Sequence, residues 1–434
     1  MRIGIVPDLT GTGGGVYQYS LAMMHALSSA GNNRDDHLIV FASEPDHPAL
    51  TSFSGQRWSV TSLSPAQRQR NILDTVGKLV GEGPHREAWR WLRRRAQRSS
   101  LSRQPELPHP DRVRYRRDFK RWFRSHGVGL MIYPAPTGLS FETEIAYLIS
   151  IHDLQHRLQP EFSEVSANGE WQRREYLFRN ACRYATLVIA DSEVGKEDIL
   201  EFYGPYGMTP DKVKVLPFIP ATYLKFDIPE TERQRVRAAY DLPDRYLFYP
   251  AQFWPHKNHF RLVQALGMLR QEYRLEVPIV FCGSYDGEIR ARMFKEVVAL
   301  SANLGLEQYV RFLGYVPDRD MSGLYAGAEA LVMPTFFGPT NIPVLEAWRF
   351  GCPVLTSDIR GIREQAGDAA VLVDPRSVES MAEGIHRLWT DQSLRSRLSA
   401  LGQRRLSSYT ANDFRARLLQ IVEEAKTRVR TKAH

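Results

Sequence analysis

The sequence has few cysteines and no long apolar run, and both shortages exclude classes of protein. Its three cysteines, among 434 residues, lie far apart with no paired spacing. This argues against a disulfide framework or a zinc site and fits a reducing compartment. No apolar run reaches the roughly 18 residues of a spanning helix, and the start MRIGIVPD enters a strand pattern rather than a signal peptide. We therefore expect a cytoplasmic protein, soluble or peripheral on the inner face of the cell membrane.

Outside one segment, the sequence has no excess of basic over acidic residues. The chain has 57 Lys and Arg against 49 Asp and Glu, but residues 86–124 alone hold 14 basic and 4 acidic residues. Four aromatic residues in this segment have the spacing of one helix face: Tyr115, Phe119, Trp122 and Phe123. The pattern favours contact with an anionic membrane surface. The residues expected to make this contact are Arg93, Arg94, Arg95, Arg116, Arg117, Lys120 and Trp122.

Two alternatives explain the same segment. Basic residues beside aromatics also suit nucleic-acid phosphates. The simpler alternative is an insertion helix whose aromatic side chains pack on their own domain while its arginines are solvated. Of these partners we expect the membrane surface and no nucleic acid.

The composition is that of an ordinary globular protein, with 43% hydrophobic and 24% charged residues, and excludes disordered, collagen-like and coiled-coil chains. Short apolar runs alternate with helical patterns through both halves, which indicates parallel sheets covered on both faces. We predict an α/β fold of two doubly wound, Rossmann-like domains facing a central cleft. The strands are expected at 3–6, 38–42, 129–133, 146–151 and 187–190, and then at 246–249, 279–282, 310–312, 331–333, 354–356 and 371–373.

The proline-containing stretch 212–229 marks the join between the domains. The predicted N-terminal domain is 1–220, with a basic insertion at about 65–127. The predicted C-terminal domain is 221–400. Residues 401–434 are expected to form a C-terminal helix that crosses back to the first domain.

Three short segments after predicted strands carry polar or flexible residues. Gly11-Thr12-Gly13-Gly14-Gly15 opens a helix and either lets backbone N–H groups approach a phosphate or sugar, or is a tight turn. His152, followed by Asp153, is placed at a strand edge, where it either donates to a sugar hydroxyl or phosphate oxygen or is structural. Lys257, at a predicted helix start, suits phosphate neutralisation; otherwise it is a surface lysine.

The segment from Thr335 to Ala347, TFFGPTNIPVLEA, is the most informative. Thr340 or Asn341 can cap a helix whose first turn contains Pro343, which makes another anion site. Glu346 lies one turn in and leans toward that helix start. Its carboxylate can accept from hydroxyls beside a bound phosphate, such as those of ribose, although it could instead only compensate the helix dipole.

Taken together, these motifs resemble glycosyltransferase family 4, the retaining nucleotide-sugar enzymes of GT-B fold. The resemblance covers nearly the whole chain and is strongest at about 245–393, in YPAQFWPHKNH, VRFLGYVPD, ALVMPTFFGPTNIPVLEAWRFGCPVLTSD and AAVLVDP. It implies that 1–220 is the acceptor-side domain, that 221–400 is the nucleotide-sugar-binding domain and that the cleft between them holds the donor. The implied catalytic set is His152, Lys257 and Glu346. The implied donor-binding residues are Gly14, Gly15, Asp153, Gln252, Lys257, Thr340, Asn341, Ile342 and Glu346.

Two positions depart from the family pattern. The first Glu of the family's Glu-x7-Glu motif falls at Gly338, and its phosphate arginine falls at Ala251, beside the neutral Gln252. The diphosphate would then depend more on Lys257 and on helix ends. The variant loop is similar to that of bacterial mannosyl- or rhamnosyltransferases of surface polysaccharide assembly.

The resemblance implies a hexosyltransferase that moves a sugar, with mannose the first choice, from a nucleotide diphosphate such as GDP-mannose. The implied acceptor is a saccharide, lipid-linked if the basic segment holds the enzyme on a membrane. No Asp-x-Asp pair sits at a strand end, so neither a metal nor another cofactor is expected. The alternatives are a nucleotide-sugar epimerase or hydrolase on the same fold, a non-catalytic nucleotide-sugar-binding scaffold, and a nucleic-acid binder.

Overall fold

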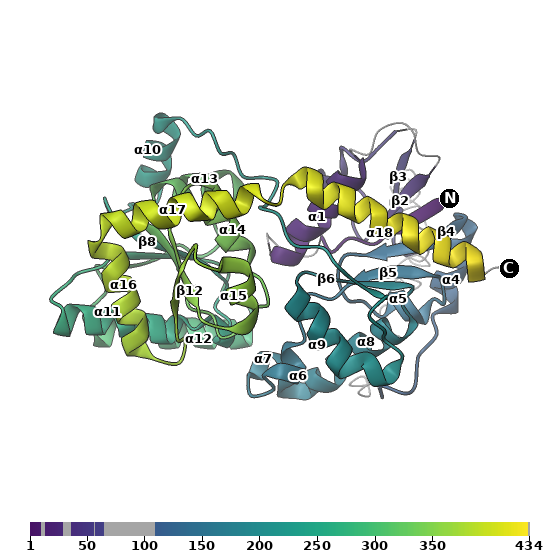
Figure 1. The fold of residues 1–434 in the computed structure, drawn as a ribbon, viewed down its shortest axis with the longest axis horizontal. Coiled ribbons are helices and arrows are strands. Elements are labelled where there is room, and N and C mark those ends of the chain that lie inside the picture. Colours follow the sequence, from purple (N-terminus) through teal and green to yellow (C-terminus); the bar gives the residue numbers. More distant parts are fainter. Residues whose placement is uncertain (10–13, 29–35, 56, 65–108, 433–434) are drawn as a thin grey trace, which may run out of the picture.

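Two parallel sheets, each covered by helices on both faces, make up the protein (Figure 1). A computed structural model describes residues 1–9, 14–28, 36–55, 57–64 and 109–432. Every strand expected from an apolar run is present within one or two residues of its predicted ends. The prediction of two doubly wound, Rossmann-like domains is therefore confirmed.

The first sheet has the strand order β3-β2-β1-β4-β5-β6-β7, with every pair of neighbours parallel. Two of its strands were missed, β3 because it lies beside the basic insertion and β7 because it has three residues and precedes the prolines of the join. The strands are β1 (Arg2–Ile5), β2 (His37–Ala42), β3 (Trp58–Ser62), β4 (Val128–Tyr133), β5 (Tyr147–Ser150), β6 (Leu187–Ala190) and β7 (Val213–Val215).

Both faces of this sheet bury apolar side chains, because successive residues of a strand point to opposite faces. In β4, Met131 and Tyr133 join one core cluster while Leu130 and Ile132 join the other. The first cluster is covered by α4 (Arg117–Ser125), α5 (Leu139–Glu142), α8 (Glu170–Tyr184) and α9 (Glu193–Tyr203). The second is covered by α1 (Gly15–Ser28) and α18 (Ala411–Lys432).

The aromatic face that was expected to meet a membrane packs mainly on its own domain. Helix α4 begins at Arg117, so the exposed Tyr115 lies outside it, whereas Phe119 and Phe123 are buried in the core. Trp122 is half-buried and donates from Nε1 to the carbonyl of Ser62 at 3.1 Å. The aromatic part of the membrane-contact prediction is therefore wrong for this helix, since burial against the sheet satisfies these side chains.

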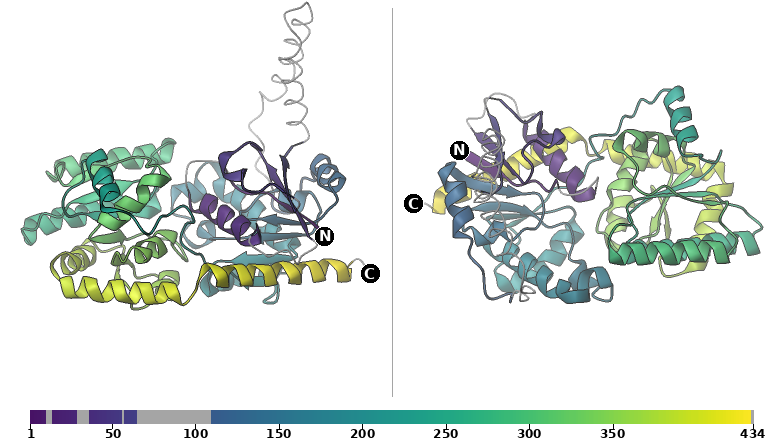
Figure 2. Two further views of the ribbon diagram at one scale, coloured as in Figure 1. Left: turned by 90° about the horizontal axis from the view of Figure 1, so that it is seen from above. Right: turned by 180° about the vertical axis from the view of Figure 1, so that it is seen from behind.

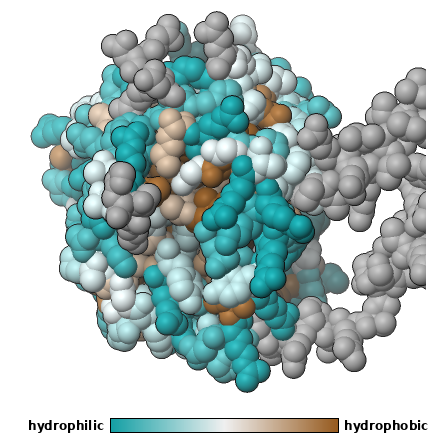
Figure 3. Space-filling model, turned by 90° about the vertical axis from the view of Figure 1, so that its right-hand side faces the viewer, coloured by the Kyte–Doolittle hydropathy of each residue, from teal (hydrophilic) through white to brown (hydrophobic). Residues whose placement is uncertain are grey.

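The basic residues of the same prediction lie in different settings. Arg116 and Arg117 are exposed, and Lys120 pairs with Glu144 at 2.6 Å. Arg93, Arg94 and Arg95 lie outside the described residues. This end of the molecule, at the right in Figure 1, shows a mainly hydrophilic described surface with small separate apolar patches (Figure 3). Among the described residues, no helix is long and apolar enough to cross a membrane.

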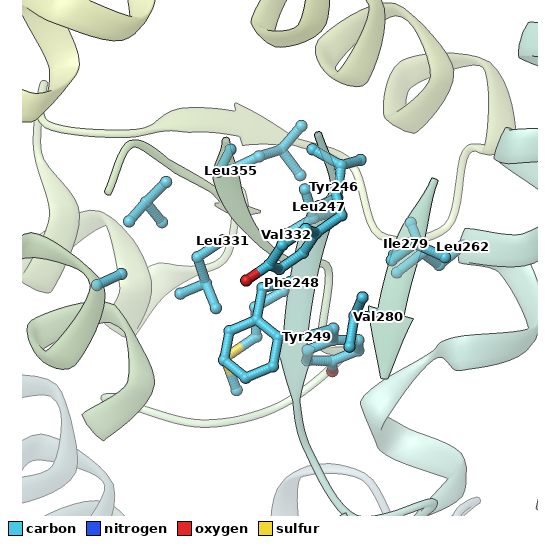
Figure 4. Packing of buried hydrophobic residues seen from close by; sticks show 14 of the residues in the cluster. Tyr246, Leu247, Phe248, Tyr249, Leu262, Ile279, Val280, Leu331, Val332 and Leu355 are labelled. Atoms are coloured by element: carbon cyan, nitrogen blue, oxygen red, sulfur yellow. The ribbon is translucent and has the colours of Figure 1, made fainter. Parts of the chain in front are cut away.

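The second sheet has the order β10-β9-β8-β11-β12-β13 and is also parallel throughout. Its central strands pack continuous apolar runs, with Phe248 and Tyr249 beside Leu331 and Val332 (Figure 4). The strands are β8 (Leu247–Pro250), β9 (Ile279–Cys282), β10 (Val310–Phe312), β11 (Ala330–Met333), β12 (Val354–Ser357) and β13 (Val371–Val373). The helices include α10 (Glu230–Ala239), α11 (His259–Glu272), α12 (Glu288–Asn303), α13 (Asp318–Gly327), α14 (Ile342–Arg349), α15 (Arg360–Ala366), α16 (Val378–Thr390) and α17 (Gln392–Ser407).

The chain passes between the domains twice. It leaves the first sheet after β7, and it returns through α18, which lies almost in line with α17 along one side of both domains (Figure 2). Phe414, Leu418 and Ile421 of α18 are buried with the strands of the first sheet, and Lys426 pairs with the buried Asp36 at 2.5 Å. The last helix therefore belongs structurally to the first domain.

Candidate active site in the inter-domain cleft

A cleft of about 570 Å³ lies between the two domains and is lined by residues of both. In each sheet the strand order reverses, between β1 and β4 in the first and between β8 and β11 in the second. Open parallel sheets bind ligands outside the carboxyl ends of strands at such reversal points. The lining residues follow from this rule, since they come from the segments after β1, β5, β6 and β7 in the first domain and after β8, β9, β10 and β11 in the second.

Two helix N-termini meet in the cleft. Gly15 opens α1 in the first domain, and a Cβ added to it would lie 3.7 Å from Cδ1 of Ile342, the first residue of α14 in the second. The first N–H groups of each helix have no intrahelical acceptor, and each helix start carries a partial positive charge. The predicted glycine segment is thus at the cleft through Gly14 and Gly15; residues 11–13 lie outside the described residues.

His152 lines the cleft just beyond β5, and a backbone carbonyl determines which of its ring nitrogens carries the hydrogen. Its Nε2 lies 2.8 Å from the carbonyl oxygen of Pro134, which can only accept, so Nε2 carries the hydrogen. Burial lowers the pKa of His152, and the neutral ring therefore presents Nδ1 as an acceptor. The prediction that His152 donates is corrected on this geometry: in the neutral state its remaining nitrogen accepts from a hydroxyl.

Lys257 is the cationic group of the cleft without an acidic partner. It ends a short 3-10 turn, Pro255–Lys257, two residues before α11 rather than at the helix start, and its carbonyl accepts from Tyr249 Oη at 2.6 Å. Burial lowers the pKa of its ammonium group to about 8, against the opposing effect of Asp153 and Glu164. No ion pair links Lys257 to an acid among the described residues.

The position of Lys257 is fixed by its neighbour. Asn258 takes a left-handed conformation (φ 61°) and is 2% exposed. Its Nδ2 donates to the carbonyls of Pro334 (2.9 Å) and Pro375 (2.8 Å), and so ties the turn to the segments after β11 and β13.

The loop before α14 is held from both domains. Thr340 donates from its hydroxyl to Asp191 of the first domain. Gln365 of α15 bonds both backbone groups of Asn341: its Oε1 accepts from the N–H at 2.9 Å, and its Nε2 donates to the carbonyl at 2.9 Å. The predicted role of the Asn341 amide as an open phosphate donor is therefore wrong for this conformation. The N–H of Ile342, the first helical residue, is the donor of this loop without an intrahelical acceptor.

Glu346 is buried at the second-domain wall of the cleft rather than exposed at a helix surface. It is 5% exposed, and its Oε2 accepts from Tyr325 Oη at 2.5 Å. Burial raises the pKa of this carboxyl to about 7, with the Tyr325 hydrogen bond opposing the rise. Such a group can accept hydrogen bonds from ligand hydroxyls that replace water.

Gly338 and Ala251 are the two positions at which the sequence was expected to depart from the pattern of the resembled family. Gly338 has φ 139°, which strains any residue with a Cβ, and an added Cβ would lie 3.1 Å from Asn341 Oδ1. The conformation of this loop therefore disfavours a glutamate at position 338. Ala251 is 8% exposed, and both it and the neutral Gln252 line the cleft, so neither position supplies a cation.

Sequence reasoning missed several charged residues of the cleft. Asp191, directly after β6, is 4% exposed, and burial raises its pKa to about 7. Glu164 accepts from His256 of the other domain at 2.8 Å, and Arg174 lies 3.6 Å from Asp153. Asp191 follows a buried strand as His152 does, so the same rule could have found it. Glu164 and Arg174 lie on helices and carry no such signal.

In the part of the chain that the structure describes, no set of three or more His, Cys, Asp or Glu side chains is placed to hold a metal ion.

Comparisons with known proteins were consistent with this geometry. Residues 230–405 match the family model "Glycosyl transferases group 1". The chain is 31% identical to the O-antigen chain mannosyltransferase B of Escherichia coli over 159 residues, which is 36% of this chain and 40% of that protein. It also matches the serotype-specific mannosyltransferase WbdA of the same species, at 24% identity over 243 residues, covering 28% of that protein. The chain thus spans less than half the length of these mannosyltransferases.

Solved structures match over nearly the whole chain. Sucrose-phosphate synthase from Thermosynechococcus elongatus has a TM-score of 0.67 at 18% identity, with 97% of each chain covered. Anabaena HepE in complex with UDP and glucose has a TM-score of 0.65 at 19% identity, covering 98% of this chain and all of that one. At these identities the likeness shows the fold, that of the GT-B glycosyltransferases. The residues that match the group 1 glycosyl transferase model, 230–405, make up most of the second domain.

Proposed function

We propose that the protein is a retaining glycosyltransferase that moves a sugar, mannose first, from a nucleotide diphosphate to a saccharide acceptor. The observation that carries the proposal is the ammonium group of Lys257, which faces the cleft without an acidic partner among the described residues. Lys257 is half-buried; a partly desolvated, unpaired charge costs free energy, and an anionic ligand would offset that cost. The likeness of the second domain to mannosyltransferases supports mannose as the sugar.

The cleft offers a separate group for each part of such a donor. The N-termini of α1 and α14, together with Lys257, suit the diphosphate. Glu346 suits the ribose hydroxyls, since its carboxylate oxygens accept. The neutral His152 suits a sugar hydroxyl, which donates to its Nδ1. Asp153, held by Gln155 N–H at 3.0 Å, lies beside His152 as a second acceptor.

Transfer breaks the bond between the anomeric carbon and the diphosphate oxygen, and the bonding electrons stay on that oxygen. The acceptor hydroxyl oxygen bonds to the same carbon on the same face, and its proton passes to the departing diphosphate. Negative charge grows on the leaving group, where Lys257 and the open N–H of Ile342 stabilise it. One such preorganised donor contributes about 3 kcal/mol to the transition state. Neither step needs a metal or another cofactor.

For the acceptor we propose a lipid-linked saccharide of surface polysaccharide or glycolipid assembly, met at the inner face of the membrane. The exposed Arg116 and Arg117 support an anionic surface nearby. Cosedimentation with anionic and neutral vesicles tests this part. Replacing Arg93, Arg94, Arg95, Arg116 and Arg117 with Gln should abolish binding to the anionic vesicles, and retained binding would contradict it.

A thermal-shift screen with GDP, UDP and ADP tests the donor assignment. A diphosphate at 100 times its Kd stabilises the folded protein by about 2.7 kcal/mol, which is enough to rank the bases. Stabilisation by none of the three would contradict the proposal.

GDP-mannose is then incubated with and without acceptor. Rapid release or isomerisation of the sugar without acceptor would indicate a hydrolase or epimerase, and binding without turnover in any acceptor extract would indicate a scaffold.

A further inference from the structure

Gln252 reaches the cleft with its amide orientation fixed by two neighbours. Its Oε1 accepts from Trp254 Nε1 at 3.0 Å and from Arg290 Nη1 at 2.8 Å. Both partners can only donate, so the atom between them must be the oxygen. The usual ambiguity between the two ends of a glutamine amide is thereby removed.

The other end of this amide is available to a ligand. Gln252 lines the cleft, and its Nε2 is neither buried nor bonded to any of the described residues. Two N–H hydrogens are therefore open to an acceptor, and Lys257, five residues later, lines the same cleft. A neutral donor stands where the resemblance leads one to expect a cation.

A cation nevertheless lies directly behind this donor. Arg290 is in the first turn of α12, with its guanidinium carbon 4.8 Å from the ring centroid of Trp254. Its Nε is buried without a hydrogen-bond partner, and no acid pairs with Arg290 among the described residues. Arginine is the residue that stacks on aromatic rings while donating through its fork, so Trp254 and Gln252 together hold it in one orientation.

We propose that Gln252 Nε2 donates to a phosphate oxygen of the donor, and that Arg290 and Trp254 are the positioning residues that aim it. This inference rests on the proposed nucleotide-sugar function. The positive charge of Arg290 polarises the amide through the shared hydrogen bond and strengthens the opposite N–H. Position 251 supplies no arginine, and in its place Arg290 of α12 acts on the phosphate through Gln252.

Binding of nucleoside diphosphates to single and double variants tests this relay. The variants are Gln252→Ala, Arg290→Met, their double combination and Arg290→Lys, with Arg292→Met, on an exposed residue of the same helix, as the matched control. The probes are GDP and UDP, with guanosine and uridine to separate contacts to phosphate from contacts to the nucleoside. Isothermal titration gives Kd for the diphosphates, and thermal shifts follow the nucleosides.

Gln252→Ala and Arg290→Met should each weaken the better diphosphate about tenfold, the range of a hydrogen bond to a charged acceptor. The double variant should lose no more diphosphate affinity than the weaker-binding single variant, because both substitutions disrupt the same interaction. Arg290→Lys should recover part of the affinity, since its ammonium can still donate to Oε1. Binding of the nucleoside should not change.

The outcomes separate this inference from the proposed function. If wild type binds a diphosphate and Gln252→Ala binds it as tightly as Arg292→Met does, the relay is wrong while the function stands. Full additivity of the two single effects would mean that Arg290 contacts the phosphate itself, which also overturns the positioning role. If wild type binds neither diphosphate, both proposals fail. Gln252→Ala alone keeps the test valid should Arg290→Met fold poorly.

Discussion

The charge state of each titratable residue in the cleft depends on its surroundings. Glu346 is buried and Lys257 is half-buried, and desolvation moves the pKa of each toward neutrality, to about 7 and about 8. The sequence predicted which residue types meet in the cleft, since each follows a buried strand or opens a helix. It could not predict that Asn341 would be bonded by Gln365 or that Pro134 would fix the hydrogen on His152, because these partners depend on tertiary packing.

At this scale, nucleotide binding should depend on the charge of Lys257. A diphosphate beside the ammonium raises its pKa, so binding near pH 8.5 should take up protons, and affinity should fall as pH rises through about 8. Titration calorimetry in two buffers of different ionisation enthalpy measures this uptake. Lys257→Met should lose it and bind the diphosphate at least tenfold more weakly. Lys295→Met, on an exposed lysine, is the control; equal proton uptake in Lys257→Met would refute the assignment.

Among the elements, α14 and the loop before it contain both a position that the sequence predicted well and one that it did not. The residues around Pro343 predicted a helix start correctly, because proline in the first turn is a local signal. The backbone of Gly338 carries no such signal. Its φ of 139° follows from how the loop is held between Asp191 and Gln365.

Restoring the family's acid at this element should therefore fail. Gly338→Glu places a Cβ at a strained φ and 3.1 Å from Asn341 Oδ1. We expect a loss of about 1–3 kcal/mol in the free energy of unfolding and no gain in transfer rate. Chemical denaturation and an activity assay measure the two effects. Gly338→Ala, which has the same backbone strain without a carboxylate, should lose similar stability; a Gly338→Glu protein that is fully stable and more active would disprove this view of the loop.

The whole molecule is held together by polar contacts between the domains. Glu364 of α15 accepts from the N–H groups of Glu193 and Val194 at the start of α9 (3.0 and 3.1 Å), and Arg360 bonds Asp198 at 2.7 Å. The alternation of strands and helices in the sequence predicted two sheets with a cleft between them. The sequence could not predict these contacts, because they join residues more than 160 positions apart that no periodic pattern relates.

Asp191, which accepts from Thr340 across this interface, makes the stability of the ligand-free protein depend on pH. Its pKa is raised from 3.8 to about 7 in the folded state. The unfolded carboxyl therefore loses its proton first, and stability falls as pH rises between these values. Relative to wild type, Asp191→Asn should gain about 3 kcal/mol between pH 5 and pH 8. Urea unfolding at both pH values measures this, with the exposed Asp46→Asn as control; a difference that does not change with pH would rule out this role.

A crystal structure of the complex with the diphosphate that ranks first in the thermal-shift screen tests the central claim most directly. We predict the diphosphate between the N-termini of α1 and α14, with an oxygen about 3 Å from Lys257 Nζ and a ribose hydroxyl at similar distance from Glu346. A nucleotide bound outside the cleft, or bound in it without contact to either residue, would contradict the account.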